Sequence, residues 1–194
     1  MLVFQDKLPS TNYNAIVSKI NSVASNLNID PNWLMLVMNF ESRLNPRAVN
    51  PISGATGLIQ FMPATAISLG TTVAQLKQMP FEDQLYYVEK YYTTWKSRIS
   101  SFIDLYLATF FPKAMGKPDD YVLETSTLPA NIIATQNPIF DPFKTGKVTV
   151  GAIKKVMLAR VPAAYLTNIA TTPTGLGLGF IGLLLFGFIL YKNV

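Results

Sequence analysis

Residues 40–66 read FESRLNPRAVNPISGATGLIQFMPATA, and this stretch decides the prediction of both fold and function. Its one acidic residue, Glu41, is flanked by the apolar side chains of Met38, Phe40 and Leu44. Apolar surroundings destabilise the ionised form of a carboxyl group, so its pKa rises and it remains a proton donor near neutral pH. A carboxylic acid of this kind suits general-acid cleavage of a glycosidic bond.

The residues before this stretch predict a helix that ends at the acid. Asp30-Pro31 is a typical helix start, because aspartate caps the first turn and proline has no N–H to leave unpaired there. The predicted helix runs to about Ser42, and Asn45-Pro46 breaks it. The partial negative charge of a helix C-terminus also disfavours an ionised carboxylate. Both influences push the pKa of Glu41 upward.

The stretch resembles the signature of the soluble lytic transglycosylases, relatives of goose-type lysozyme. The residues that match are Glu41, Ser42, Asn45, Pro46, Gly54, Ala55, Gly57, Leu58, Gln60, Met62, Pro63, Thr65 and Ala66. The resemblance implies a lysozyme-like helical domain over residues 1–117 that cuts the glycan strand of peptidoglycan between N-acetylmuramic acid and N-acetylglucosamine. Glu41 would be its catalytic acid, and no cofactor or metal is implied.

The resemblance also implies residues that contact the substrate. They are Ser42, Gly57, Leu58, Gln60, Met62 and Tyr106. We expect Gly57 to let the backbone approach a sugar ring, Gln60 to offer an amide, and Met62 to supply an adaptable apolar wall. Tyr106 is a candidate because residues 104–107 read DLYL, similar to the variant of the family's Ala-Tyr-Asn motif in phage-borne members.

The composition excludes several other kinds of hydrolase. The 194 residues include no cysteine and no histidine. Without them the chain has no thiol nucleophile, no serine–histidine triad and no usual zinc ligand. The chemistry that remains depends on a carboxylate.

Apolar periodicity predicts an all-α domain around the signature. The first expected helix starts at Asn12 and is capped by Ser10 or Thr11. Further helices are expected over 63–69, about 80–97 and 101–111. We expect residues 112–137 to be irregular. Within the predicted segment 118–160, residues 141–149 resemble a calcium-binding helix–loop–helix turn. Phe143 and Ala152 stand where its third and twelfth ligands are needed, so we predict a degenerate loop without metal, followed by a helix over 150–160.

The C-terminal part of the sequence predicts a membrane anchor. After a linker at 161–172, the nineteen residues 173–191 carry no charge, and as a helix they would span about 28 Å, close to the thickness of a bilayer's hydrocarbon. A stripe of Gly175, Gly179 and Gly182 suits self-association of transmembrane helices. From residue 126 onward there are six basic residues and one acid, which supply the net charge of +5 and suit anionic lipid. Nucleic-acid binding is not predicted, because no recognisable module carries a basic stripe with interleaved aromatic residues.

These observations lead to one function and three alternatives. The leading hypothesis is a membrane-anchored peptidoglycan lytic transglycosylase that leaves 1,6-anhydro ends, in the virion of a membrane-containing phage that opens the cell wall during entry. A hydrolytic lysozyme of the same fold is the first alternative. A tail-anchored enzyme of the bacterial inner membrane is the second. The third is a non-catalytic membrane or vertex protein that contacts other virion proteins and keeps the lysozyme-like domain.

Overall fold

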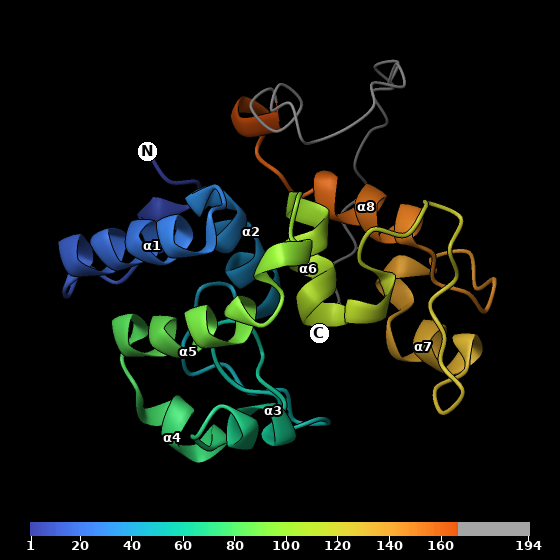
Figure 1. Cartoon of the computed structure of the whole chain (residues 1–194), viewed down its shortest axis with the longest axis horizontal. Coiled ribbons are helices and arrows are strands. Elements are labelled where there is room, and N and C mark those ends of the chain that lie inside the picture. Colours follow the sequence, from blue (N-terminus) through green and yellow to red (C-terminus); the bar gives the residue numbers. More distant parts are fainter. Residues whose placement is uncertain (167–194) are drawn as a thin grey trace, which may run out of the picture.

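The computed structural model describes residues 1–166, and Figure 1 shows its helices in chain order. The predicted transmembrane helix at 173–191 and the second half of the predicted linker at 161–172 lie outside these residues. The α-helices are α1 (Tyr13–Leu27), α2 (Pro31–Ser42), α3 (Pro63–Ser68), α4 (Val73–Gln78), α5 (Phe81–Thr93), α6 (Phe102–Phe110), α7 (Ala130–Gln136) and α8 (Val150–Leu158). The described residues also contain four 3-10 turns: η1 (Gln5–Lys7) before α1, and η2 (Lys96–Arg98), η3 (Pro112–Ala114) and η4 (Pro138–Phe140) between helices. The described residues contain isolated β-bridges and no strand, which confirms the all-α prediction there.

Local capping explains where α2 begins and ends. The Asp30 carboxylate accepts a hydrogen bond from the backbone N–H of Asn32 at 2.8 Å, and Pro31 occupies the first helical position. Arg43 and Leu44 then adopt left-handed backbone conformations, with φ of 58° and 62°. Two such residues in succession end the helix, so Glu41 lies in its last turn.

The start of α1 differs from the prediction. Asn12, with φ 60°, is the residue before the helix, and neither Ser10 nor Thr11 caps it. The Asn12 side-chain amide donates instead to Glu82 on α5 at 2.6 Å. A tertiary contact has therefore replaced the local cap that we expected. The helix at 80–97 is also shorter than predicted, because α5 ends at Thr93 and η2 follows.

The helices pack in two neighbouring groups. In Figure 1, α1 to α5 occupy one side, α7 and α8 the other, and α6 runs between them. Helix α1 packs against α5 and α2, and α2 packs against α6. One buried apolar core extends from Leu2 to Tyr165, so residues 118–160 share the core of the helices before them. Helix α2 is therefore held by contacts with both α1 and α6.

The segment after α6 contains a helix that the sequence analysis missed. We expected irregular chain over 112–137, but α7 occupies Ala130–Gln136. Only Ile133 and Ala134 of this seven-residue helix are buried, so it has no apolar repeat to reveal it. No helix among the described residues combines the length and apolar character needed to cross a membrane.

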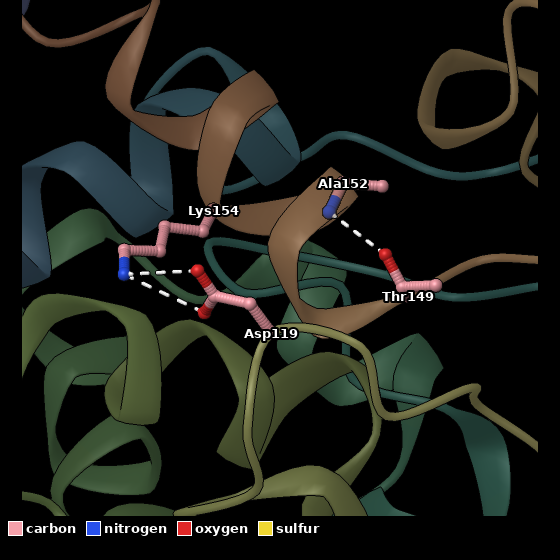
Figure 2. A network of polar contacts seen from close by, with 4 residues as sticks. All are labelled: Asp119, Thr149, Ala152 and Lys154. Atoms are coloured by element: carbon pink, nitrogen blue, oxygen red, sulfur yellow. Dashed lines mark hydrogen bonds and ion pairs between the residues drawn. The ribbon is translucent and has the colours of Figure 1, made fainter. Parts of the chain in front are cut away.

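The turn that resembles a calcium loop is closed by its own hydrogen bonds. The Asp141 carboxylate accepts from the backbone N–H groups of Thr145 and Gly146, both at 2.8 Å. In residues 1–166 no three acidic, histidine or cysteine side chains gather as a metal site. Figure 2 shows how the following helix begins: the Thr149 hydroxyl accepts from the Ala152 N–H at 3.1 Å, and Lys154 pairs with Asp119 at 3.4 Å. Asp119 thereby ties α8 to the chain that follows α6.

Candidate active site

Glu41 is a partly exposed residue in the last turn of α2. Within residues 1–166 no hydrogen bond or ion pair reaches its carboxylate. Burial raises the pKa of Glu41 from 4.5 to about 7, because the charged form loses hydration that nothing replaces. At neutral pH the group is therefore divided between acid and base, as a residue that must donate and then accept a proton requires.

Three tyrosines lie within electrostatic reach of this carboxyl group. They are Tyr91 and Tyr92 on α5 and Tyr106 on α6. Burial raises the pKa of each phenol, and the negative charge of Glu41 raises it further. The Tyr91 hydroxyl donates to the Ala108 carbonyl oxygen at 2.6 Å, which joins α5 to α6. These phenols stay neutral and polar beside the acid.

Tyr106 is held by other aromatic rings. Its side chain is only 1% exposed. The ring meets Phe40 edge to face with centroids 5.3 Å apart, and stacks on Phe110 at 5.8 Å. Phe140 from η4 closes the cluster, with its centroid 6.1 Å from that of Tyr106. The predicted site tyrosine is thus near Glu41, but its ring offers no surface for stacking a sugar, and only its hydroxyl can serve the site.

A buried glutamine of α5 organises the loop that follows Glu41. Gln84 is fully buried, and its side-chain amide donates to the Pro46 and Leu76 carbonyl oxygens at 2.6 Å each. Its Oε1 accepts from the Leu58 N–H at 3.0 Å. Gly57 has φ +85°, and a Cβ there would lie 2.4 Å from that Oε1. The Gln84 side chain therefore fills the space that a Cβ at position 57 would need, and the approach of a sugar ring to the Gly57 backbone stays a prediction.

Sequence reasoning missed Gln84, although a signal was present. The residue shares the inner face of the predicted helix over 80–97 with the apolar side chains of Phe81, Leu85 and Val88. A glutamine on an apolar face must satisfy four hydrogen-bonding positions without water. Such a residue indicates an internal network.

Two further predicted contact residues are buried in the same network. The Ser42 hydroxyl lies 2.9 Å from both the Met38 and the Leu58 carbonyl oxygens, so it fastens the loop to the end of α2. Leu58 is fully buried and Ser42 is 6% exposed. Both side chains are buried, and the Ser42 hydroxyl positions the loop; their contact with a substrate stays a prediction.

Gln60 and Met62 keep accessible side chains. The Gln60 amide donates to the Gly57 carbonyl oxygen at 3.1 Å, from a left-handed backbone position with φ 54°. Met62 is 47% exposed and precedes the first turn of α3. Among the predicted contact residues from Ser42 to Met62, these two have exposed side-chain surface.

The stretch from α1 to α5 also carries the similarity to known proteins. Residues 18–90 match the Transglycosylase SLT domain. A protein of Enterobacteria phage PRD1 described as "Transglycosylase" is 46% identical over 55 residues, which are 28% of this chain and 20% of that relative. No solved structure matches. Both matches support a lytic transglycosylase, the class predicted from the sequence.

Only part of the candidate site lies within the matched residues. Glu41, the loop from Asn45 to Met62 and Gln84 all lie inside residues 18–90. Tyr106 and everything after α5 lie outside. The aromatic cluster therefore combines Phe40, inside the matched residues, with Tyr106, Phe110 and Phe140, outside them.

Proposed function

We propose that this chain is a peptidoglycan lytic transglycosylase in which Glu41 is the catalytic acid and base. The observation that carries the proposal is the pKa of about 7 at an unpaired carboxyl group, at the end of a helix inside the matched SLT segment. A group with that pKa supplies both protonation states near neutral pH.

The reaction begins when protonated Glu41 donates its proton to the glycosidic oxygen and the bond from that oxygen to C1 of the muramic acid breaks. The substrate's own N-acetyl oxygen or C6 hydroxyl then replaces the second carboxylate of an ordinary glycosidase. The Glu41 carboxylate accepts the C6 hydroxyl proton as that oxygen bonds to C1. The product has a 1,6-anhydro end, and Glu41 is protonated again.

The two buried aspartates support a mechanism with one carboxylate. Asp104 accepts hydrogen bonds from Ser100, Ser101 and the Gly116 N–H, at 2.7 to 3.2 Å. Asp141 is engaged by its own turn. Both carboxylates stabilise local structure and are not free to act as a nucleophile.

Product analysis on purified peptidoglycan tests the proposal. The wild-type chain should release fragments with 1,6-anhydro ends, each lighter by one molecule of water than the corresponding fragment with a reducing end. Glu41→Gln should release no fragments. Glu124→Gln, which changes an exposed carboxyl group in the same way, is the matched control. Fragments with reducing ends would indicate a hydrolytic lysozyme instead. A wild type that cuts nothing would favour the non-catalytic structural protein.

We further propose that the enzyme is anchored to a membrane through residues 173–191 and acts from the virion of a membrane-containing phage. The uninterrupted apolar sequence there and the resemblance to a phage transglycosylase support this. The full chain should float with lipid vesicles, and a chain ending at residue 166 should not. The protein should also be found in purified lipid-containing particles, and its absence from them would favour a cellular membrane.

A further inference from the structure

The turn of residues 138–147, which includes η4 and leads to α8, carries exposed apolar side chains. Phe143 is 85% exposed and Ile139 is 44% exposed. Ile132, on α7, which packs against η4, is also exposed. Exposed apolar side chains that gather in one region mark surfaces that contact another molecule. This region lies outside the matched residues 18–90, so the catalytic assignment does not account for it.

Hydrogen bonds inside the turn give it a fixed shape. The Asp141 carboxylate accepts from the backbone N–H groups of Thr145 and Gly146, and from the Thr145 hydroxyl, each at 2.8 Å. The Lys144 N–H donates to the Asp141 carbonyl oxygen at 3.1 Å. A closed turn has little conformational freedom left to lose on binding, so the exposed Phe143 is presented in advance.

The exposed charges of the turn are positive. Lys144 and Lys147 are both exposed, and neither forms an ion pair within residues 1–166. One exposed acid, Glu124, lies at the base of the turn, because the N–H of its neighbour Leu123 donates to the Val148 carbonyl oxygen. Apolar side chains flanked by lysines are complementary to an anionic bilayer, where rings enter the interface and cations meet the lipid phosphates.

The sequence after the described residues limits how far the domain can lie from a membrane. The apolar stretch 173–191, proposed above as the anchor, begins seven residues after Leu166. A fully extended chain spans about 3.5 Å per residue, so these residues reach at most about 25 Å. That is less than the diameter of about 40 Å of a compact domain of this size. One side of an anchored domain therefore lies close to the lipid headgroups.

The position of the turn leaves the candidate active site accessible. In Figure 1 the turn lies on the side of α7 and α8, whereas α3, at the end of the loop that follows Glu41, lies on the other side. Contact between the turn and a bilayer would direct α3 and that loop away from the lipid. An enzyme that is held at a membrane and cuts the cell wall needs this orientation, because its substrate lies outside the bilayer.

We infer that the 138–147 turn docks the domain on an anionic lipid bilayer. Phe143 and Ile139 enter the interface, and Lys144 and Lys147 meet the lipid phosphates. One ring and two lysines bind too weakly to hold a protein at a bilayer without a second attachment, so the turn orients a chain that is already anchored. The inference rests on the proposed membrane attachment and adds the face of the domain that meets the lipid.

Quenching by nitroxide-labelled lipid tests this contact in the full chain. The sequence has no cysteine, so Ile139→Cys provides a single site for a fluorescent label beside an intact Phe143. Ile67→Cys, at a residue of α3 that is 67% exposed, provides the matched control label. In vesicles of phosphatidylcholine with phosphatidylglycerol, the label at 139 should be strongly quenched and the label at 67 should not.

Substitutions in the Ile139→Cys chain identify the groups responsible. Phe143→Ser should remove most of the quenching and leave the melting temperature unchanged, because the ring is exposed. Lys144→Gln and Lys147→Gln should each lower the ratio of docked to free turn about fivefold, the effect of one lysine at an anionic surface. Lys77→Gln, on α4, is the matched loss of an exposed charge and should change nothing.

Three outcomes would overturn the inference. The first is equal quenching of the labels at 139 and 67, which would show that the domain has no preferred face toward the lipid. The second is unchanged quenching after Phe143→Ser and after both lysine substitutions. The third is equal quenching in vesicles with and without phosphatidylglycerol, which would show that charge does not select this surface.

Flotation of the same samples separates this inference from the proposed membrane attachment. A chain that floats without quenching at 139 refutes the role of the turn and leaves the anchor in place. A chain that does not float refutes the anchor. Titration with excess vesicles then still tests the turn, because quenching requires no lasting attachment, and its absence there would refute the turn as well.

Discussion

Replacing Glu41 by glutamine should abolish activity and at the same time stabilise the fold at neutral pH. The carboxyl group has a pKa of about 7 in the folded chain and 4.5 as a model group. Between these values the folded state binds more protons than the unfolded state, so the free energy of unfolding falls as pH rises from about 4.5 to about 7. Glutamine keeps the shape of the side chain and never ionises.

The size of the effect follows from the pKa difference. A difference of about 2.5 pKa units corresponds to about 3 kcal/mol at most above pH 7, at roughly 1.4 kcal/mol per unit. Below pH 4.5 the carboxyl group is protonated in both states, and the gain should vanish. Water that reaches the partly exposed carboxylate reduces the figure.

The assay is urea unfolding of the wild type and Glu41→Gln at pH 4 and pH 8. Stability of the variant should exceed that of the wild type at pH 8 and equal it at pH 4. Wild-type cleavage should decline above about pH 7, where the donor loses its proton, and the variant should be slower by a factor of about 10² or more. Equal stabilities at pH 8, or a variant weakened at that pH, would refute the assignment of Glu41 as a desolvated acid.

Three other substitutions test parts of the site and its attachment. Gly57→Ala forces a Cβ against the Gln84 side chain at a position with a left-handed backbone. The free energy of unfolding, measured in urea, should fall by at least about 3 kcal/mol, and a loss under about 1 kcal/mol would contradict the packing. Tyr106→Phe keeps the buried ring, so stability should change by less than about 1 kcal/mol while cleavage slows about tenfold, and unchanged cleavage would leave the hydroxyl without a role. Tyr165→Phe removes the hydroxyl that donates to Asp30 and should lower the free energy of unfolding by about 1.5 kcal/mol, which thermal unfolding would measure; an unchanged melting temperature would argue against that bond.

The elements that local chemistry determines were predictable from the sequence. Helix α2 begins after Asp30 and ends at Ser42 as expected, because the cap, the first-turn proline and the break at Asn45-Pro46 all act within a few residues. The raised pKa of Glu41 was also expected, since its apolar neighbours are adjacent in the sequence.

The parts that depend on distant contacts were not predictable in the same way. Gln84 bonds to Leu58 and Pro46, which are 26 and 38 residues away, and no local pattern pairs them. For the same reason the close approach of the Gln84 side chain to Gly57 could not be predicted from the sequence. Helix α7 escaped because it buries too few residues to produce a period.

The hydrogen bond from Tyr165 to Asp30 joins the C-terminal end of the described chain to the residue that caps α2. Asp30 caps the same helix whose last turn holds Glu41. A displacement of Tyr165 would therefore act on the cap of the helix that positions Glu41. Attachment of the protein through that end would therefore set the orientation of Glu41 relative to the surface to which the protein is attached.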